Sequence, residues 1–225
     1  MIILTGASGG MGKFLFAEIE QNEPIIGISN TKTLTPSHKG IAAKVNLENP
    51  EDIKSFVSSN KKYMNNVTLV NMAVYSQDGL LANYNPDHLA KTFTVNLFSN
   101  IHLAQALLPT MIEQRFGRII HISSIVGQSG NIGAGAYASS KSALVGYNKT
   151  LCKEYGRFGI TSNIISLGYF EGGLINTLSE DKVAAITSEI PSKKLGQPCD
   201  ILSALSFIRE CKYLNGEIIN LHGGL

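Results

Sequence analysis

Two residues near the middle of the chain, Tyr137 and Lys141, have the types and spacing needed for acid–base chemistry. If the segment around them is helical, residues four apart project from one face, a single turn from each other. A phenol has an unperturbed pKa near ~10, and a nearby cation stabilises the phenolate and lowers that pKa. Tyr137 can then give a proton to a carbonyl oxygen or take one from an alcohol. Such a pair alone also arises by chance on amphipathic surface helices.

Two further polar residues support this chemistry. Ser124 ends the apolar run that begins at Arg118, where a strand places its last side chain, and its hydroxyl can hold the carbonyl oxygen. Asn96 lies within an apolar stripe of helical spacing. Either its amide ties down a neighbouring backbone, or a kinked turn there holds a water for proton transfer. The candidate catalytic residues are therefore Asn96, Ser124, Tyr137 and Lys141.

A glycine-rich segment near the start of the chain predicts a phosphate site. The apolar run Met1–Thr5 enters it, and the helical pattern Lys13–Gln21 follows it. Small residues let the backbone come close to a ligand, and N–H groups at a helix N-terminus bind an anion. The strand before the glycines and the helix after them are the context that a dinucleotide site requires. The expected cofactor contacts here are Gly6, Ser8, Gly9, Gly10, Met11 and Gly12.

The end of the second predicted strand, Pro24–Ser29, indicates which dinucleotide binds. A carboxylate at this position would hydrogen-bond the ribose 2′-hydroxyl and repel a 2′-phosphate. The window Ser29–Lys32 contains no carboxylate and ends on a lysine. NADP(H) is therefore favoured over NAD(H), with Asn30 expected to contact the cofactor.

Strand and helix patterns alternate through most of the chain. This alternation predicts one α/β domain over residues 1–225: a doubly wound Rossmann-type domain with a parallel sheet of about seven strands and helices on both faces. Ligands bind at the carboxyl ends of such strands. Gln128 and Tyr169 follow strand ends and are expected to line the substrate pocket with Ser124 and Tyr137. The remaining predicted strands are Ile41–Leu47, Val67–Asn71, Arg118–Ser123, Ile160–Ser166 and Glu217–Leu221. One predicted helix starts at Asn49, a long one runs from Asn85 to about Gln114 and is stopped by Gly117, and a third spans Ala136–Tyr155.

Composition narrows the class of protein. With 225 residues, 44% of them hydrophobic and 16% charged, the chain is typical of a compact enzyme or binding domain. Its net charge of +2 gives no reason to invoke nucleic acid or an anionic membrane. The first strand begins at Met1, which leaves no room for a leader, so a cytoplasmic protein is expected. Neither the five histidines nor the three cysteines have metal-ligand spacing, and we expect reduced, mostly buried thiols at Cys152, Cys199 and Cys211.

These motifs resemble the short-chain dehydrogenase/reductase family over essentially the whole chain, Thr5 to Gly224, and 3-oxoacyl-(acyl-carrier-protein) reductases in particular. The family's Thr-Gly-x-x-x-Gly-x-Gly matches Thr5, Gly6, Gly10 and Gly12. Its serine matches Ser124, and its Tyr-x-x-x-Lys matches Tyr137 and Lys141, thirteen residues further on.

The resemblance implies a hydride exchanged between a nicotinamide and a carbonyl carbon. Ser124 would hold the oxygen and Tyr137 would supply the proton. Lys141 would lower the pKa of the phenol and bind the nicotinamide ribose, and Asn96 would support a relay water. The family also implies a homodimer or homotetramer built on the long helix and the Tyr137 helix, and a substrate lid over about 169–191. Its further cofactor contacts fall on Asn46 and Leu47 at the adenine, and on Asn71, Ala73, Gly168 and Phe170.

Several positions depart from the family pattern. Val74 and Leu167 replace a glycine and a proline, Gly172 replaces a threonine, and Gly9 replaces a basic residue found in members that prefer NADP. A regulator or scaffold that binds a nucleotide without efficient turnover is therefore an alternative. A sugar-nucleotide epimerase or dehydratase shares the Tyr-x-x-x-Lys chemistry, but it needs a substantial C-terminal substrate domain.

Overall fold

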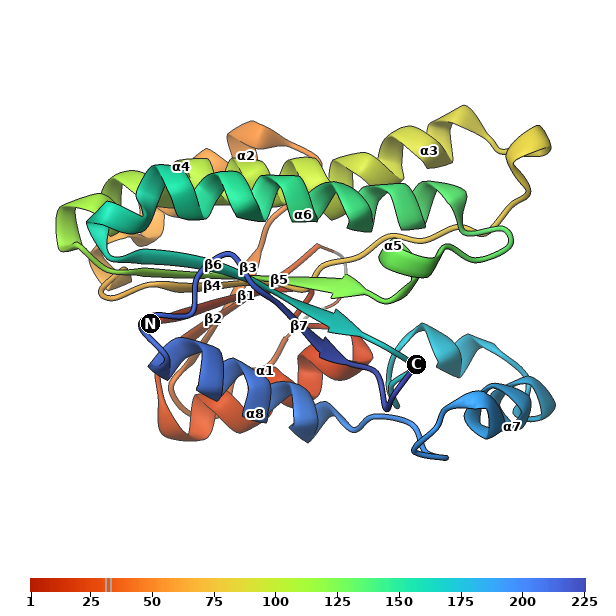
Figure 1. Cartoon of the computed structure of the whole chain (residues 1–225). Helices are drawn as coiled ribbons and strands as arrows, with labels where there is room; N and C mark the ends of the chain where they lie inside the picture. Colours follow the sequence, from red (N-terminus) through yellow and green to blue (C-terminus); the bar gives the residue numbers. More distant parts are fainter. Residues whose placement is uncertain (31, 33) are drawn as a thin grey trace.

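The chain folds as a seven-stranded parallel sheet between two layers of helices, as predicted (Figure 1). This computed structural model describes residues 1–30, 32 and 34–225. The strand order is β3-β2-β1-β4-β5-β6-β7, so β1 lies between β2 and β4 and the order reverses there. Ligands of doubly wound sheets bind at such a reversal. The strands are β1 (Ile2–Thr5), β2 (Ile25–Ser29), β3 (Gly40–Lys44), β4 (Thr68–Asn71), β5 (Gly117–Ser124), β6 (Ile160–Leu167) and β7 (Ile218–Leu221).

Each face of the sheet has its own apolar core. On one face, α1 (Gly10–Asn22) and α8 (Pro198–Glu210) pack against the sheet through residues such as Leu15 and Leu205. On the other, α2 (Pro50–Asn60), α4 (Ser99–Gln114) and α6 (Gly135–Tyr155) pack through residues such as Phe56 and Leu107. The inner strands are therefore buried along their whole length. The shorter elements are η1 (Lys61–Tyr63), η2 (Leu81–Asn83), α3 (Pro86–Phe93), η3 (Thr94–Phe98), α5 (Val126–Ser129), η4 (Gly156–Phe158), η5 (Leu174–Thr177) and α7 (Glu180–Glu189).

The starts of α2 and α3 follow from capping asparagines. The side chain of Asn49 accepts the backbone N–H of Glu51 at 3.0 Å, and that of Asn85 accepts the N–H of Asp87 at 2.8 Å. A proline occupies the first turn of each helix, where its missing N–H has no partner to lose.

The predicted long helix is formed by α3, η3 and α4 in succession, and the π-helical turn η3 at Asn96 is the kink that was one of the two interpretations of this residue. Two other expectations about local structure were wrong. Gly117 does not stop that helix: Arg115 ends it in a left-handed conformation with φ of 50°, and Gly117 begins β5. The cysteines are free as expected, but Cys152 and Cys211 are only half-buried and Cys199 is exposed.

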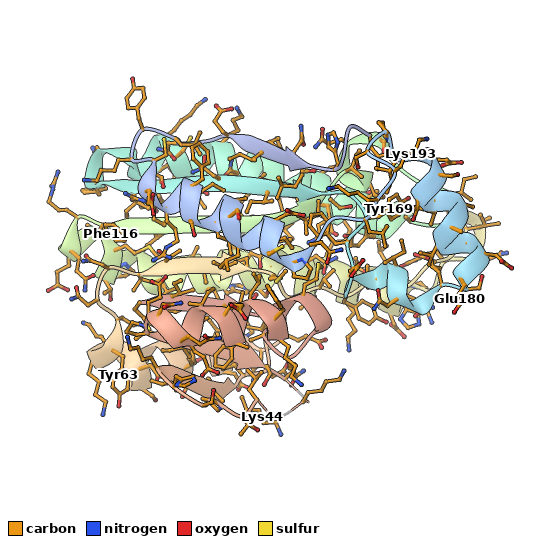
Figure 2. The ribbon with its side chains drawn as sticks, turned by 90° about the horizontal axis from the view of Figure 1, so that it is seen from below. Lys44, Tyr63, Phe116, Tyr169, Glu180 and Lys193 are labelled. Atoms are coloured by element: carbon orange, nitrogen blue, oxygen red, sulfur yellow. The ribbon has the colours of Figure 1, made fainter. Side chains whose placement is uncertain are left out.

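The carboxyl ends of the strands lie at one end of the molecule. In Figure 2, Tyr169, which follows β6, lies at the same end as Glu180 of α7, whereas Phe116, which precedes β5, lies at the opposite end. The glycine-rich turn after β1, Ser124 and the segment after β6 therefore share one edge of the sheet. None of the helices in the ranges 1–30 and 34–225 is both long and apolar enough to cross a membrane.

Candidate active site

The glycine-rich turn between β1 and α1 has a shape that side chains would fill. Gly6 has φ of +69°, and a Cβ on Gly12 would lie 2.2 Å from the carbonyl oxygen of Gly6. Among the described residues no side chain caps α1, and its first turn contains no acid. The first backbone N–H groups of a helix have no intrahelical partner. The turn therefore presents N–H groups, close backbone and no negative charge, which is what a pyrophosphate requires.

The end of β4 is fastened to this turn. The hydroxyl of Thr5 accepts the N–H groups of Met72 and Ala73, both at 2.9 Å. A Cβ on Gly6 would lie 2.9 Å from the backbone of Ala73, so these two predicted cofactor residues touch. The hydroxyl of Thr5 thus holds the β1 and β4 ends together where the sheet reverses.

The three residues expected near adenine lie at the ends of β2 and β3. Asn30 is exposed, and Asn46 is half-buried with its side chain accepting the N–H of Glu48. Leu47 is buried in the core under α2, so its backbone and not its side chain is available to a ligand. Residue 31 of the window after β2 lies outside the described residues.

Ser124 and Tyr137 meet where β5 faces the first turn of α6. The Ser124 hydroxyl accepts the N–H of Val126 at 3.2 Å and is hydrogen-bonded to the Tyr137 phenol. Burial raises the pKa of Tyr137, and the hydrogen bond with Ser124 acts against that rise. The two hydroxyls therefore form the pair that the sequence predicted: one group to hold a carbonyl oxygen and one to move its proton.

Lys141 lies one turn further along α6 and is fully enclosed. Its Nζ donates to the carbonyl oxygen of Ile122 at 2.7 Å and lies 5.8 Å from the centroid of the Tyr137 ring. Burial lowers the pKa of Lys141 to about 8. The expectation that this ammonium lowers the pKa of Tyr137 needs correction. In this structure burial raises the pKa of Tyr137, and the ammonium donates to the Ile122 carbonyl of β5.

Asn96 lies in the π-helical turn and has a fully bonded side chain. Its Oδ1 accepts the N–H of Tyr75 at 2.8 Å, and its Nδ2 donates to the carbonyl of Tyr75 at 2.9 Å and to the hydroxyl of Ser140 at 3.0 Å. The kinked turn is thus present, but the amide of Asn96 ties down the segment after β4. The main-chain oxygen of Asn96 accepts a hydrogen bond from Asn100 at 2.9 Å.

Two serines that the sequence analysis did not single out hold this group together. Ser140 is fully buried and donates to the carbonyl oxygen of Tyr137 at 2.8 Å, while accepting from Asn96. Ser123 donates to the carbonyl oxygen of Lys141 at 3.3 Å. Sequence spacing could have identified both serines. Ser140 is three residues after Tyr137, on the same helix face, and Ser123 is adjacent to Ser124.

Asn71 was expected to bind the cofactor, but its side chain faces a buried histidine. Its Nδ2 lies 3.1 Å from Nδ1 of His121, the residue beside it in β5. Burial, together with the charge of Lys141, lowers the pKa of His121 to about 3, so this ring is neutral. The Oδ1 of Asn71 is buried and has no hydrogen-bond partner among the described residues.

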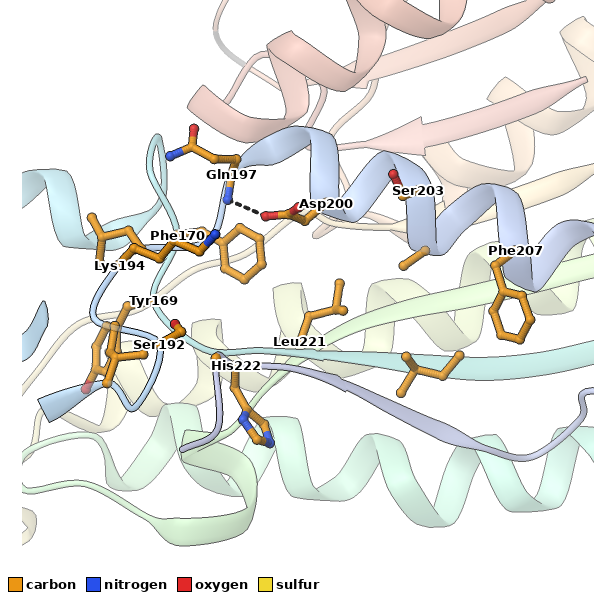
Figure 3. Close-up of a pocket in the computed structure, with 16 residues that line it drawn as sticks. Tyr169, Phe170, Ser192, Lys194, Gln197, Asp200, Ser203, Phe207, Leu221 and His222 are labelled. Carbon is orange, nitrogen blue, oxygen red and sulfur yellow. Dashed lines mark hydrogen bonds between the residues drawn. The ribbon is translucent and has the colours of Figure 1, made fainter.

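The residues after β6 divide between the sheet edge and a separate cavity. Figure 3 shows Tyr169 and Phe170 at a cavity of about 590 Å³ that α8 and β7 also line. Ser124, Tyr137 and Lys141 do not line it. The ring of Phe170 packs over Gly196 in the core, and the N–H of Gly168 donates to Leu221 at 2.8 Å. The structure therefore does not bring the side chains of Tyr169 and Phe170 together with the catalytic hydroxyls.

The amide of Gln128 is likewise occupied away from the catalytic group. Its Nε2 donates to the hydroxyl of Ser166 at 3.0 Å and to Oδ1 of Asn220 at 3.1 Å. Gln128 thus links α5 to the ends of β6 and β7, next to the site but not directed at Tyr137.

The segment after Phe170 lies directly on the glycine-rich turn. A Cβ on Gly10 would lie 2.2 Å from the carbonyl oxygen of Gly172, which itself has φ of +74°. The N–H of Gly172 is held by the side chain of Asn176 at 3.2 Å. Gly172 therefore covers the start of α1, where the pyrophosphate would lie.

These features together fit a nicotinamide dinucleotide. The glycine turn suits the pyrophosphate, the ends of β2 and β3 suit the adenosine, and the Ser124–Tyr137 pair suits the reacting end. No cluster of three or more His, Cys, Asp or Glu residues that could hold a metal ion occurs in the part of the chain that the structure describes.

Comparisons with known proteins agree with this geometry. A profile of the family described as short chain dehydrogenase matches residues 1–183. The chain is 31% identical to the 3-oxoacyl-(acyl-carrier-protein) reductase FabG of Vibrio cholerae and 32% identical to that of Salmonella typhimurium, with 99% of this chain and 96% of each relative covered. It is 30% identical to Nodulation protein G of a Rhizobium species, over 99% of this chain and 95% of that relative. The chain belongs to the short-chain dehydrogenase family and is an oxidoreductase that uses a nicotinamide cofactor.

Proposed function

We propose that this oxidoreductase reduces 3-oxoacyl thioesters to 3-hydroxyacyl thioesters with NADPH. The observation that carries the proposal is the hydrogen-bonded pair Ser124 and Tyr137 beside the buried Lys141, at the same sheet edge as the glycine cradle. The thioester substrate is supported by the two FabG relatives, which are named as 3-oxoacyl-(acyl-carrier-protein) reductases.

The chain's own residues account for the proton in this reaction. When bound, the dinucleotide supplies the hydride to the carbonyl carbon. Ser124 holds the carbonyl oxygen, and the Tyr137 phenol donates its proton to that oxygen as negative charge develops there. The raised pKa of Tyr137 keeps the phenol protonated at neutral pH, which is the form needed for reduction. Lys141, one turn further along α6, keeps its ammonium on the carbonyl oxygen of Ile122.

The cofactor preference for NADP(H) rests on charge. Asn30 and Lys32 are both exposed after β2, so no carboxylate there opposes a 2′-phosphate, and the lysine attracts it. We expect Asn30→Asp to lower kcat/KM for NADPH by about fivefold while that for NADH stays within a factor of two, since one solvated like-charge contact is worth about 1 kcal/mol. Equal losses with both cofactors would contradict this assignment.

We infer that residues 169–191 form the lid of this single domain. Support comes from the contact of Gly172 with Gly10 and from the two short helices, η5 and α7, that the segment contains. Closure of such a segment excludes water from the reacting groups.

We also propose a cytoplasmic homodimer or homotetramer. The free thiols of all three cysteines suit a reducing compartment. The layer that contains α4 and α6 presents partly exposed apolar groups such as Phe98, which is 45% exposed. Light scattering with a Phe98→Ser variant tests whether this layer joins subunits.

The decisive experiment follows NADPH and NADH absorbance with 3-oxoacyl thioesters and small ketones, for the native protein and for Tyr137→Phe. Turnover that is lost in Tyr137→Phe with cofactor affinity retained is the expected result. Cofactor binding without turnover on any substrate would instead indicate the nucleotide-binding regulator. Lys149→Met, an exposed change on the same helix, is the matched control.

A further inference from the structure

An exposed aliphatic surface lies beside the catalytic tyrosine. Leu80, Leu81 and Ile132 are 62%, 79% and 88% exposed. Leu81 covers the first turn of α6: a Cβ on Gly135 would lie 2.7 Å from its Cδ2. Gly135 is two residues before Tyr137, so this surface, the aliphatic rim, lies at the turn of α6 that carries the tyrosine. In Figure 1 the segment before α3 and the loop between α5 and α6 lie at the same end of the molecule as α7.

The two loops that form the rim are held together by hydrogen bonds. The N–H of Gly79 donates to the carbonyl oxygen of Gly133 at 2.9 Å, which ties one loop to the other. Within the first loop, the Tyr84 hydroxyl donates to the carbonyl of Gln77 at 2.7 Å, and the N–H of Asn83 donates to Leu80 at 3.0 Å. The three aliphatic side chains are thus carried by loops that hydrogen bonds hold in place. Apolar groups gathered on a fixed surface mark a contact with an apolar ligand or partner.

The geometry points to the acyl chain of the substrate as the group that covers this rim. We propose that the enzyme prefers 3-oxoacyl thioesters of medium or long chain, whose hydrocarbon lies across Leu81 and Ile132 while the 3-oxo group meets Ser124 and Tyr137. This inference rests on the proposed function. Its contact with the α6 turn that carries Tyr137 supports it.

The test compares a short and a long substrate. We expect Leu81→Ser and Ile132→Ser each to lower kcat/KM for 3-oxodecanoyl-N-acetylcysteamine by about fivefold, because the chain loses part of its apolar contact. The value for acetoacetyl-N-acetylcysteamine should stay within twofold. Leu81→Met should restore the long-chain value. Tyr213→Ser, at a fully exposed aromatic between α8 and β7, is the matched control.

A binding measurement separates this inference from the proposed function. Decanoyl-N-acetylcysteamine has no 3-oxo group to reduce, and calorimetry should show weaker binding to Leu81→Ser than to the native protein. Binding that depends on Leu81 without turnover of any thioester would retain the rim as a chain site and overturn the reductase proposal. An equal loss of kcat/KM on both substrates, or an unchanged kcat/KM for the long-chain substrate, would overturn the proposal that the rim binds the acyl chain. A change of molecular mass in light scattering with unchanged kinetics would make the rim a subunit contact and overturn it as well.

Discussion

Replacing Lys141 with methionine should stabilise the cofactor-free protein at neutral pH. Burial lowers the pKa of Lys141 from its ordinary value of 10.5 to about 8. At about 1.4 kcal/mol per pH unit, the charged amine is disfavoured in the folded state by ~3 kcal/mol. Methionine has a similar length and no charge. We expect the free energy of unfolding at pH 7 to rise by about 1–3 kcal/mol. The rise falls at the lower end of this range if the buried Ile122 carbonyl is left without a hydrogen-bond donor.

The pH dependence of this gain is the sharper test. Between pH 8 and 10.5 the unfolded chain binds more protons at Lys141 than the folded chain, so the stability of the native protein rises with pH in that window. Lys141→Met has no such proton, and its advantage should shrink by up to ~3 kcal/mol as the pH rises through the window. Urea unfolding followed by circular dichroism measures both proteins, with the exposed Lys149→Met as control. A variant that is less stable at pH 7 by an amount independent of pH would refute the reasoning.

Three further changes test other parts of the structure. Ser124→Ala removes the hydrogen bond that opposes the raised pKa of Tyr137, so the pH profile of alcohol oxidation should move to higher pH and kcat should fall by about a hundredfold in steady-state assays. Burial raises the pKa of Glu20, but hydrogen bonds from Ser37 and His38 outweigh burial, so the pKa lies below its ordinary value. Glu20→Gln should therefore lower the free energy of unfolding in urea near pH 7 by about 1–3 kcal/mol. This difference should vanish as the pH falls through the folded-state pKa of Glu20. Gly12→Ala should lower the unfolding free energy by about 1–3 kcal/mol and weaken cofactor binding, because its Cβ meets the backbone of Gly6; unchanged affinity would remove this turn from the cofactor site.

The elements that local sequence determines were predicted well. The apolar runs became the seven parallel strands, and Asn49 and Asn85 cap helices because a short polar side chain followed by proline encodes a helix start. The alternation of these patterns was enough to predict the sheet edge that gathers the glycine turn, Ser124 and Tyr169.

Features that depend on tertiary partners were not predictable from spacing. The π-helical turn arises where the amide of Asn96 bonds the backbone of Tyr75, a residue far away in sequence. Arg115 ends α4 in a left-handed conformation, and no glycine stands at this position to indicate the end of the helix. Spacing gave the helix face of Lys141 but not the direction of its ammonium, because the acceptor, Ile122, belongs to another element.

The catalytic arrangement depends on a single junction between one strand and one helix. Three consecutive residues of β5 contact α6: Ile122 accepts from Lys141, Ser123 donates to the main chain of Lys141, and Ser124 bonds the Tyr137 phenol. The carbonyl oxygen of Ile122 and the hydroxyls of Ser123 and Ser124 thus reach different atoms of the same helix. A slip of α6 by one turn would break all three contacts at once. The packing of α6 on β5 thus fixes the Ser124 hydroxyl and the Tyr137 phenol and also keeps the charge of Lys141 buried. This packing, and not a flexible loop, offsets the free energy that disfavours the buried charge.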